Sequence, residues 1–118
     1  MITSTPITSS TDTRLFPVTL PYTGTDAITV MIFCNTATPN LSDETENAVY
    51  LELNVVPSGE TVSSTDNCIV KNLLVPAGET VFFDTERLVL SNGDFVSGKI
   101  TQINGTGTIA ATVSTLTV

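Results

Sequence analysis

The chain has 118 residues and a formal net charge of −8, with twelve Asp and Glu against four Lys and Arg and no His. This length suits one domain that is large enough to bury a hydrophobic core. The four basic residues, Arg14, Lys71, Arg87 and Lys99, are scattered along the sequence, so they cannot neutralise a run of phosphates or an anionic membrane surface. The charge therefore argues against nucleic acid and membranes as partners.

The composition favours strands over helices. Ser and Thr together supply thirty-two residues, twenty-two of them Thr, and Val supplies thirteen. β-branched side chains suit a pleated, half-buried surface. Charged residues make up 14% of the chain, against ~25% in an average domain. Two interpretations stay open: a β protein whose Thr-rich faces meet other subunits, or a soluble sandwich that uses Thr as its polar face.

Residues 1–12 (MITSTPITSSTD) are polar and rich in Ser and Thr, with Ile2 and Ile7 as apolar anchors and Pro6 between them. They have no basic cluster and no apolar stretch of a secretory signal, so we expect a product made and kept in a reducing cytosol, or assembled there. Such a segment cannot form a core. We predict an extended arm that is mobile in the isolated protein and ordered against a neighbouring subunit. Deleting residues 2–10 should then leave folding intact.

From Thr13 onward, short β-type segments alternate with turn residues. Residues 13–20 predict an edge strand because Pro17 lacks an amide donor, and the apolar run at 27–35 predicts a central strand. Residues 36–47 form the longest loop, and turns at Ser91–Asp94 and Asn104–Gly105 predict two hairpins. The predicted strands cover 13–20, 27–35, 48–56, 67–75, 80–84, 88–90, 95–103 and 108–116.

A repeat supports this architecture. The heptapeptide VPSGETV at 56–62 returns nineteen positions later as VPAGETV at 75–81. In each copy an apolar run ends, Pro fixes φ for a tight turn and Gly takes a conformation that other residues resist. The pair predicts equivalent corners of a β-sandwich or barrel. We therefore predict one all-β domain over 13–118: an antiparallel β-sandwich of about eight strands, jelly-roll or Ig-like.

The sequence predicts no catalytic residue, no cofactor-binding residue and no metal ligand. There is no His, so the usual general base is missing. Lys71 and Lys99 lie in no nucleophile motif, and Gly105-Thr106-Gly107 predicts only a turn. Cys34 and Cys68 sit in apolar runs, where each is most simply a small buried hydrophobic residue, although a disulfide between them is an open alternative.

Paired carboxylates occur at Asp43, Glu44 and Glu46, and again at Asp84 and Glu86 with Asp94 nearby. The spacing of a Ca²⁺-binding loop is missing, and so are the aromatic platforms that suit a sugar cleft. We interpret 43–46 as a solvated acidic loop and 84–87 as a turn with a local ion pair. Tyr22 and Tyr50 either anchor an interface or belong to a turn and a half-buried strand face.

The segment 68–94 runs as a strand, a P-A-G-E-T turn, an aromatic strand, a short L-V-L strand and an N-G-D turn. It resembles small all-β virion proteins of tailed bacteriophages, which often read K-N-L-x-x-P-A-G-E-T followed by L-x-x-G-D. Residues 32–36, 53–57 and 111–114 also fit, so the likeness covers 26–118.

The resemblance implies a non-enzymatic, oligomeric virion protein assembled in the host cytoplasm. Our first expectation is a head decoration (cement) protein that binds the capsid exterior as a homotrimer, with the major capsid protein or other virion proteins as partners. A neck, tail or baseplate component is the first alternative. A carbohydrate- or ligand-binding β-sandwich is the second.

Overall fold

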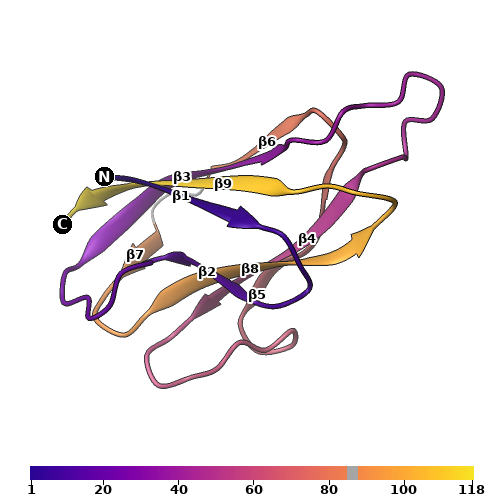
Figure 1. The fold of residues 1–118 in the computed structure, drawn as a ribbon. Helices are drawn as coiled ribbons and strands as arrows, with labels where there is room; N and C mark the ends of the chain where they lie inside the picture. The colour runs from indigo at the N-terminus through magenta and orange to yellow at the C-terminus, as the bar shows by residue number, and fades with distance from the viewer. Residues whose placement is uncertain (85–87) are drawn as a thin grey trace.

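The computed structural model describes residues 1–84 and 88–118 as two antiparallel sheets packed face to face (Figure 1). This described part of the chain contains no helix, and hence none long and apolar enough to cross a membrane. The predicted antiparallel β-sandwich is confirmed. Its nine strands are β1 (Ile2–Ile7), β2 (Thr13–Phe16), β3 (Asp26–Asn35), β4 (Val49–Val56), β5 (Cys68–Val75), β6 (Thr80–Phe83), β7 (Leu88–Leu90), β8 (Phe95–Ile103) and β9 (Ile109–Thr117).

The two sheets have a nested strand order. The five-stranded sheet runs β1-β9-β3-β6, with β7 also paired to β3, and the four-stranded sheet runs β2-β8-β4-β5. The pairs β1–β9, β2–β8, β3 with β6 and β7, and β4–β5 therefore nest inside one another, like a single antiparallel ribbon that has been rolled up. This is the order of a jelly roll, one of the two topologies predicted from the sequence.

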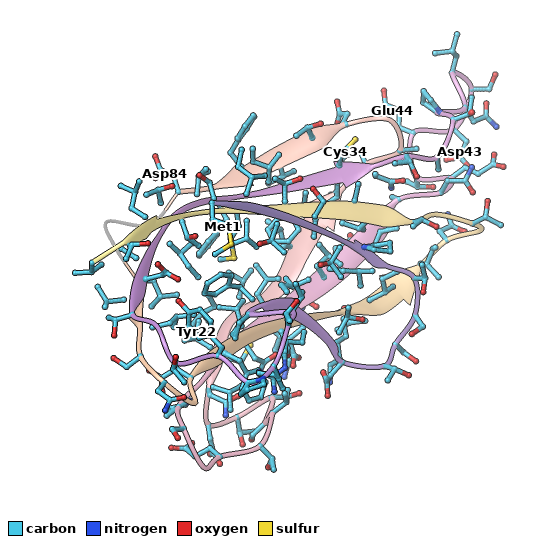
Figure 2. All side chains as sticks on the ribbon, turned by 60° about the vertical axis from the view of Figure 1, so that its left-hand side comes forward. Met1, Tyr22, Cys34, Asp43, Glu44 and Asp84 are labelled. Atoms are coloured by element: carbon cyan, nitrogen blue, oxygen red, sulfur yellow. The ribbon has the colours of Figure 1, made fainter. Side chains whose placement is uncertain are left out.

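The core lies between the sheets because each strand turns alternate side chains inward. Ile28, Met31 and Phe33 of β3 and Leu51 and Leu53 of β4 are almost completely buried. The same apolar cluster also takes in Ile7, Leu15, Phe16, Val49, Val75, Leu90, Val96, Ile100, Ile109, Ala111 and Val113. The side chains between the two layers are visible in Figure 2.

The N-terminal segment differs from the expectation. The sequence predicts residues 1–12 as an arm outside the domain, but Ile2–Ile7 form β1, which pairs antiparallel with β9 of the same chain. Ile7 is fully buried in the core, where its Cδ1 would lie 3.1 Å from a Cβ added at Gly98 of the opposite sheet. The physical reason is that β9 offers an unpaired edge and Gly98 leaves room for Ile7. The sandwich therefore begins at β1 rather than at Thr13.

Both predicted hairpins are wrong. The turn at Ser91–Asp94 closes as expected, with the Asp94 amide 3.0 Å from the Ser91 carbonyl oxygen. However, it joins β7 of the five-stranded sheet to β8 of the four-stranded sheet. The Asn104–Gly105 connection likewise joins β8 to β9, which lie in different sheets. β7 and β9 pair with β3, whereas β8 pairs with β2 and β4, so each turn crosses from one sheet to the other.

The repeated heptapeptides form matching turns. In the first copy the Glu60 amide donates to the Pro57 carbonyl oxygen, and in the second the Glu79 amide donates to Pro76, each at 3.1 Å. Gly59 and Gly78 have φ of 85° and 74°, values that favour glycine. The second turn carries the chain from β5 to β6 of the other sheet, whereas the first opens into the loop 57–67.

Two further expectations concern strand ends. β2 stops at Phe16 rather than at residue 20, because Pro17 has no amide hydrogen to continue the ladder. The turn and ion pair predicted at 84–87 involve residues 85–87, which lie outside the described residues.

Candidate interaction surface

The outer face of the five-stranded sheet is set by the register of its strands. Phe82 of β6 lies opposite Ile32 of β3, Ile32 lies opposite Thr112 of β9, and Thr112 lies opposite Ser4 of β1. Side chains at paired positions share a face of the sheet. Because Met31 and Phe33 point into the core, this row points away from it.

The same rule gives the whole face, which we call the neutral face. Phe82, Leu116 and Ile2 are large apolar residues with 65%, 63% and 72% of their surface exposed. None of the residues on this face is charged. The neutral face consists of Ile2, Ser4 and Pro6 of β1, Ala110, Thr112, Ser114 and Leu116 of β9, Ala27, Val30, Ile32 and Cys34 of β3, Thr80 and Phe82 of β6, and Val89 of β7.

Most charges of the described chain lie away from the neutral face. Asp43, Glu44 and Glu46 are in the loop 36–48, and Figure 2 shows Asp43 and Glu44 at the end of the molecule beyond the sheets. Other carboxylates lie in the loop 57–67, in the turns at Glu79 and Asp94, and at Asp84, two positions after Phe82. The fourteen positions of the neutral face are therefore uncharged on a strongly acidic protein, with Asp84 next to them at the end of β6.

Part of the outer surface of the opposite sheet is polar, and the loop 57–67 of the same chain covers that part. Glu52 of β4 is only 2% exposed, and its Oε2 lies 3.6 Å from the Lys99 ammonium of β8. The Ser64 hydroxyl, from the loop 57–67, donates to the same oxygen at 2.9 Å. This ion pair lies beneath the loop 57–67 and has a structural role.

Two buried polar atoms lie beside this ion pair without a hydrogen-bond partner in the described residues. They are Asn54 Oδ1 and Ser97 Oγ, on residues that face each other across β4 and β8. The side-chain nitrogen Nδ2 of Asn54 donates to the Ser63 carbonyl oxygen at 2.9 Å and to Asn67 Oδ1 at 3.0 Å. An ordered water between two such groups is the usual solution in protein interiors.

The acidic residues that the sequence offered as candidate ligands do not lie together at one site. No group of three or more Cys, Asp or Glu in residues 1–84 and 88–118 could hold a metal ion. Asp94 instead caps turns, accepting from the Ser58 and Ser91 amides at 2.9 Å each. Hydrogen bonds from the hydroxyl and then the amide of Thr45 hold the pKa of exposed Asp43 below its ordinary value.

The two tyrosines and the two cysteines lie in different parts of the fold. The Tyr22 ring meets Phe16 edge-on with centroids 5.5 Å apart, and its hydroxyl donates to Asp26, so Tyr22 belongs to the fold. Tyr50 faces outward on β4. Cys34 and Cys68 are free, half-buried thiols in different sheets, and Figure 2 shows Cys34 on the outer side of its sheet.

Sequence reasoning did not identify the neutral face, although part of its signal was available. In the strand 80–83, Thr80 and Phe82 point to one side and Val81 and Phe83 to the other. One of the two Phe side chains must therefore point away from the core. Which strands gather beside Phe82 depends on the sheet order. No family model, no curated protein and no solved structure matches this chain.

Proposed function

We propose that this chain is a non-enzymatic structural protein that binds other protein subunits through the neutral face. The observation that carries the proposal is that three large apolar side chains, Phe82, Leu116 and Ile2, are exposed on a sheet face whose own positions carry no charge. Contiguous exposed apolar surface of this kind marks interaction sites. Interface centres are likewise depleted in charged residues and enriched in aromatic ones.

The placement of charge supports assembly. Copies of a chain with a net charge of −8 repel one another. Contact through the neutral face brings apolar and hydroxyl groups together and leaves the carboxylates in solvent. Association is then driven by burial of apolar area, at roughly 25 cal/mol per Å², and it avoids the cost of desolvating charges.

The resemblance of residues 68–94 to small phage virion proteins gives the proposal its specific form. The protein is a head decoration protein that binds the major capsid protein on the capsid exterior as a homotrimer, and it resides in the virion. A lattice supplies many equivalent sites, so modest contacts at each site add up to stable coverage. A neck, tail or baseplate component would use the same face in fewer copies.

The experiment is a charge insertion with a matched control. Phe82→Asp places a carboxylate on the neutral face at its edge strand β6, while Val18→Asp makes the same change at a residue that is 47% exposed outside the strands. Sedimentation measures self-association, and co-sedimentation with capsids measures binding. We expect the Phe82→Asp protein to lose self-association and capsid binding, and the Val18→Asp protein to keep both. Equal behaviour of the two variants would refute the assignment of this face.

A thiol footprint gives an independent readout. Cys34 lies on the neutral face, whereas Cys68 lies in the other sheet and serves as an internal reference. Assembly should slow alkylation of Cys34 and leave Cys68 unchanged. Mass spectrometry of purified particles then separates the two virion roles: copies in proportion to capsid subunits mean decoration, and a ring-sized number means neck or tail. Absence of the protein from particles would exclude both.

A further inference from the structure

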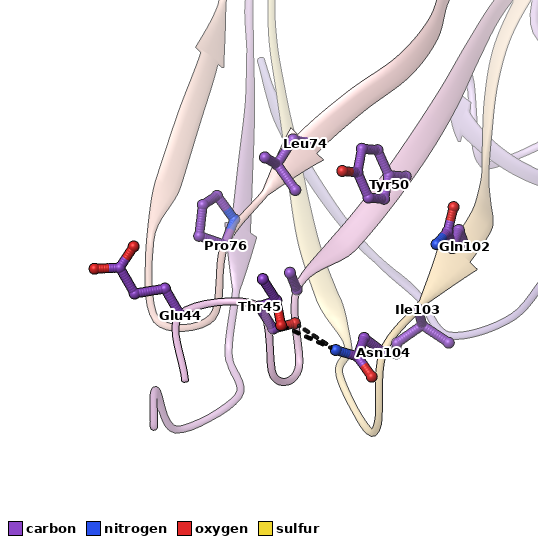
Figure 3. Close-up of a pocket in the computed structure, with 9 residues that line it drawn as sticks. Glu44, Thr45, Tyr50, Leu74, Pro76, Gln102, Ile103 and Asn104 are labelled. Atoms are coloured by element: carbon purple, nitrogen blue, oxygen red, sulfur yellow. Dashed lines mark hydrogen bonds between the residues drawn. The ribbon is translucent and has the colours of Figure 1, made fainter. Parts of the chain in front are cut away.

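A groove lies on the outer side of the four-stranded sheet, beside the loop 36–48. It consists of two adjoining hollows of about 390 Å³ and 490 Å³ that share Glu44, Thr45, Leu74 and Pro76. Because the shared residues join them, we treat the hollows as one groove and call it the loop groove. Its size falls in the range of ligand sites, ~300–1,000 Å³. The first hollow is drawn in Figure 3.

The floor of the loop groove is apolar and comes from paired strands. Tyr50 of β4 lies opposite Leu74 of β5 on one side and Gln102 of β8 on the other. Leu74 is 43% exposed and Ile103 is 38% exposed. Figure 3 shows Tyr50, Leu74 and Pro76 along one side of the hollow. A floor of this kind accepts an aliphatic or aromatic side chain.

The wall of the groove is acidic. Glu44, Glu46 and Glu79 line it, and no Lys or Arg is among the lining residues. Glu46 already accepts a hydrogen bond from the Asn40 amide. In the described structure, the carboxylates of Glu44 and Glu79 have no hydrogen bond or ion pair, and the Tyr50 hydroxyl and Gln102 side chain also lack protein partners. These groups are free to meet a bound molecule.

The loop that forms the wall is held in place before any ligand arrives. The side-chain nitrogen Nδ2 of Asn104 donates to the Thr45 carbonyl oxygen at 3.0 Å, a contact drawn in Figure 3. Asn47 Oδ1 accepts from the Thr106 amide at 2.8 Å, and Asn35 anchors the Asn47 carbonyl oxygen at 2.8 Å. A preformed groove loses little conformational entropy on binding.

We propose that the loop groove binds an extended segment of a partner protein that carries Lys or Arg beside an aliphatic or aromatic side chain. The apolar residue packs against Tyr50 and Leu74, and the flanking cations approach Glu44 and Glu79. Lys and Arg suit both parts because their stems cover apolar surface while their charged heads reach the wall. The charge of the groove selects against acidic segments, including further copies of this chain. The inference is independent of the neutral face.

The test is an NMR titration with a defined probe, an acetylated and amidated heptapeptide of alternating lysine and leucine, at low ionic strength. Saturable shifts should centre on the amides of Tyr50, Leu74 and Asn104. The double change Glu44→Gln with Glu79→Gln should weaken binding about fivefold, as expected for two exposed ion pairs. Leu74→Ala should weaken it by a similar factor, about fivefold, through lost apolar contact.

Matched controls separate this groove from general attraction to an acidic protein. Glu60→Gln with Asp66→Asn removes the same charge from the loop 57–67, and Ile69→Ala truncates a residue of β5 that is 42% exposed, close to the value for Leu74. Both should change affinity by less than about twofold. Equal losses in the groove and control variants, shifts spread along the free edge of β5, or no saturable shift in the groove would each overturn the proposal.

Discussion

Asn35 donates a hydrogen bond of 2.8 Å from Nδ2 to the carbonyl oxygen of Asn47, twelve residues away. Asn35 ends β3 and is completely buried. The same nitrogen reaches the Val75 carbonyl oxygen at 3.0 Å, and Asn35 Oδ1 accepts from the Ala37 amide at 3.0 Å. One side chain thus joins the end of β3, the loop 36–48 and the end of β5. Three backbone groups near the loop groove depend on it.

Asn35→Ala should lower the free energy of unfolding by about 2–3 kcal/mol, because it leaves buried backbone groups unsatisfied. Denaturant titration measures the change. Asn72→Ala, at an exposed position of β5, is the control and should stay within about 0.5 kcal/mol. A similar small change for both variants would show that water replaces the Asn35 amide at no cost.

Ile7→Ala tests whether β1 belongs to the sandwich in solution. Ile7 is 0% exposed and Ile2 of the same strand is 72% exposed. We expect Ile7→Ala to lower the free energy of unfolding by about 2–4 kcal/mol, because it removes buried apolar surface and leaves a cavity. Ile2→Ala should lower it by less than about 0.5 kcal/mol. Thermal unfolding gives both values. Two equal, small effects would mean that β1 leaves β9 in the isolated protein, as the sequence suggested.

The Glu52–Lys99 pair should behave as a coupled unit. Lys99→Met leaves the nearly buried Glu52 carboxylate without its counter-ion. It should lower the free energy of unfolding by about 2–3 kcal/mol, since Lys99 is itself partly exposed. Adding Glu52→Gln should recover a large part of this loss, because a neutral amide needs no counter-ion. A double-mutant cycle by chemical unfolding measures the coupling, about 1–3 kcal/mol for neighbouring charges. Additive effects would contradict the pairing at 3.6 Å.

Asp43 should titrate at a lower pH than an ordinary Asp, because the hydroxyl and amide of Thr45 stabilise its charged form. Its contribution to folding is therefore present near neutral pH and is lost as pH falls through the folded-state pKa. Carboxyl ¹³C shifts measured against pH report this pKa directly. Thr45→Val should raise it and Thr38→Val, in the same loop, should not. An unchanged pKa in Thr45→Val would assign the shift to other causes.

Particular residues show how far the sequence reaches. The apolar run at 27–35 predicted β3 and the strand-type segment at 48–56 predicted β4, because such patterns depend only on neighbours along the chain. Pro57–Glu60 and Pro76–Glu79 predicted two turns for the same reason. The hairpins at Asn92–Gly93 and Asn104–Gly105 failed because a turn signal fixes the bend but does not say which sheet receives the next strand. The partner of Ile7 lies more than ninety residues away at Gly98.

The sequence by itself determined the β class, most strand positions, the matched turns and the acidic charge, since these follow from composition and local patterns. Only the tertiary structure decided the nested strand order, the incorporation of β1 and the two surfaces on which the proposals rest. The neutral face needs four separate segments placed in register beside Phe82, and the loop groove needs β4, β5 and β8 beside a loop. Such surfaces arise from contacts between distant segments, which no local pattern records.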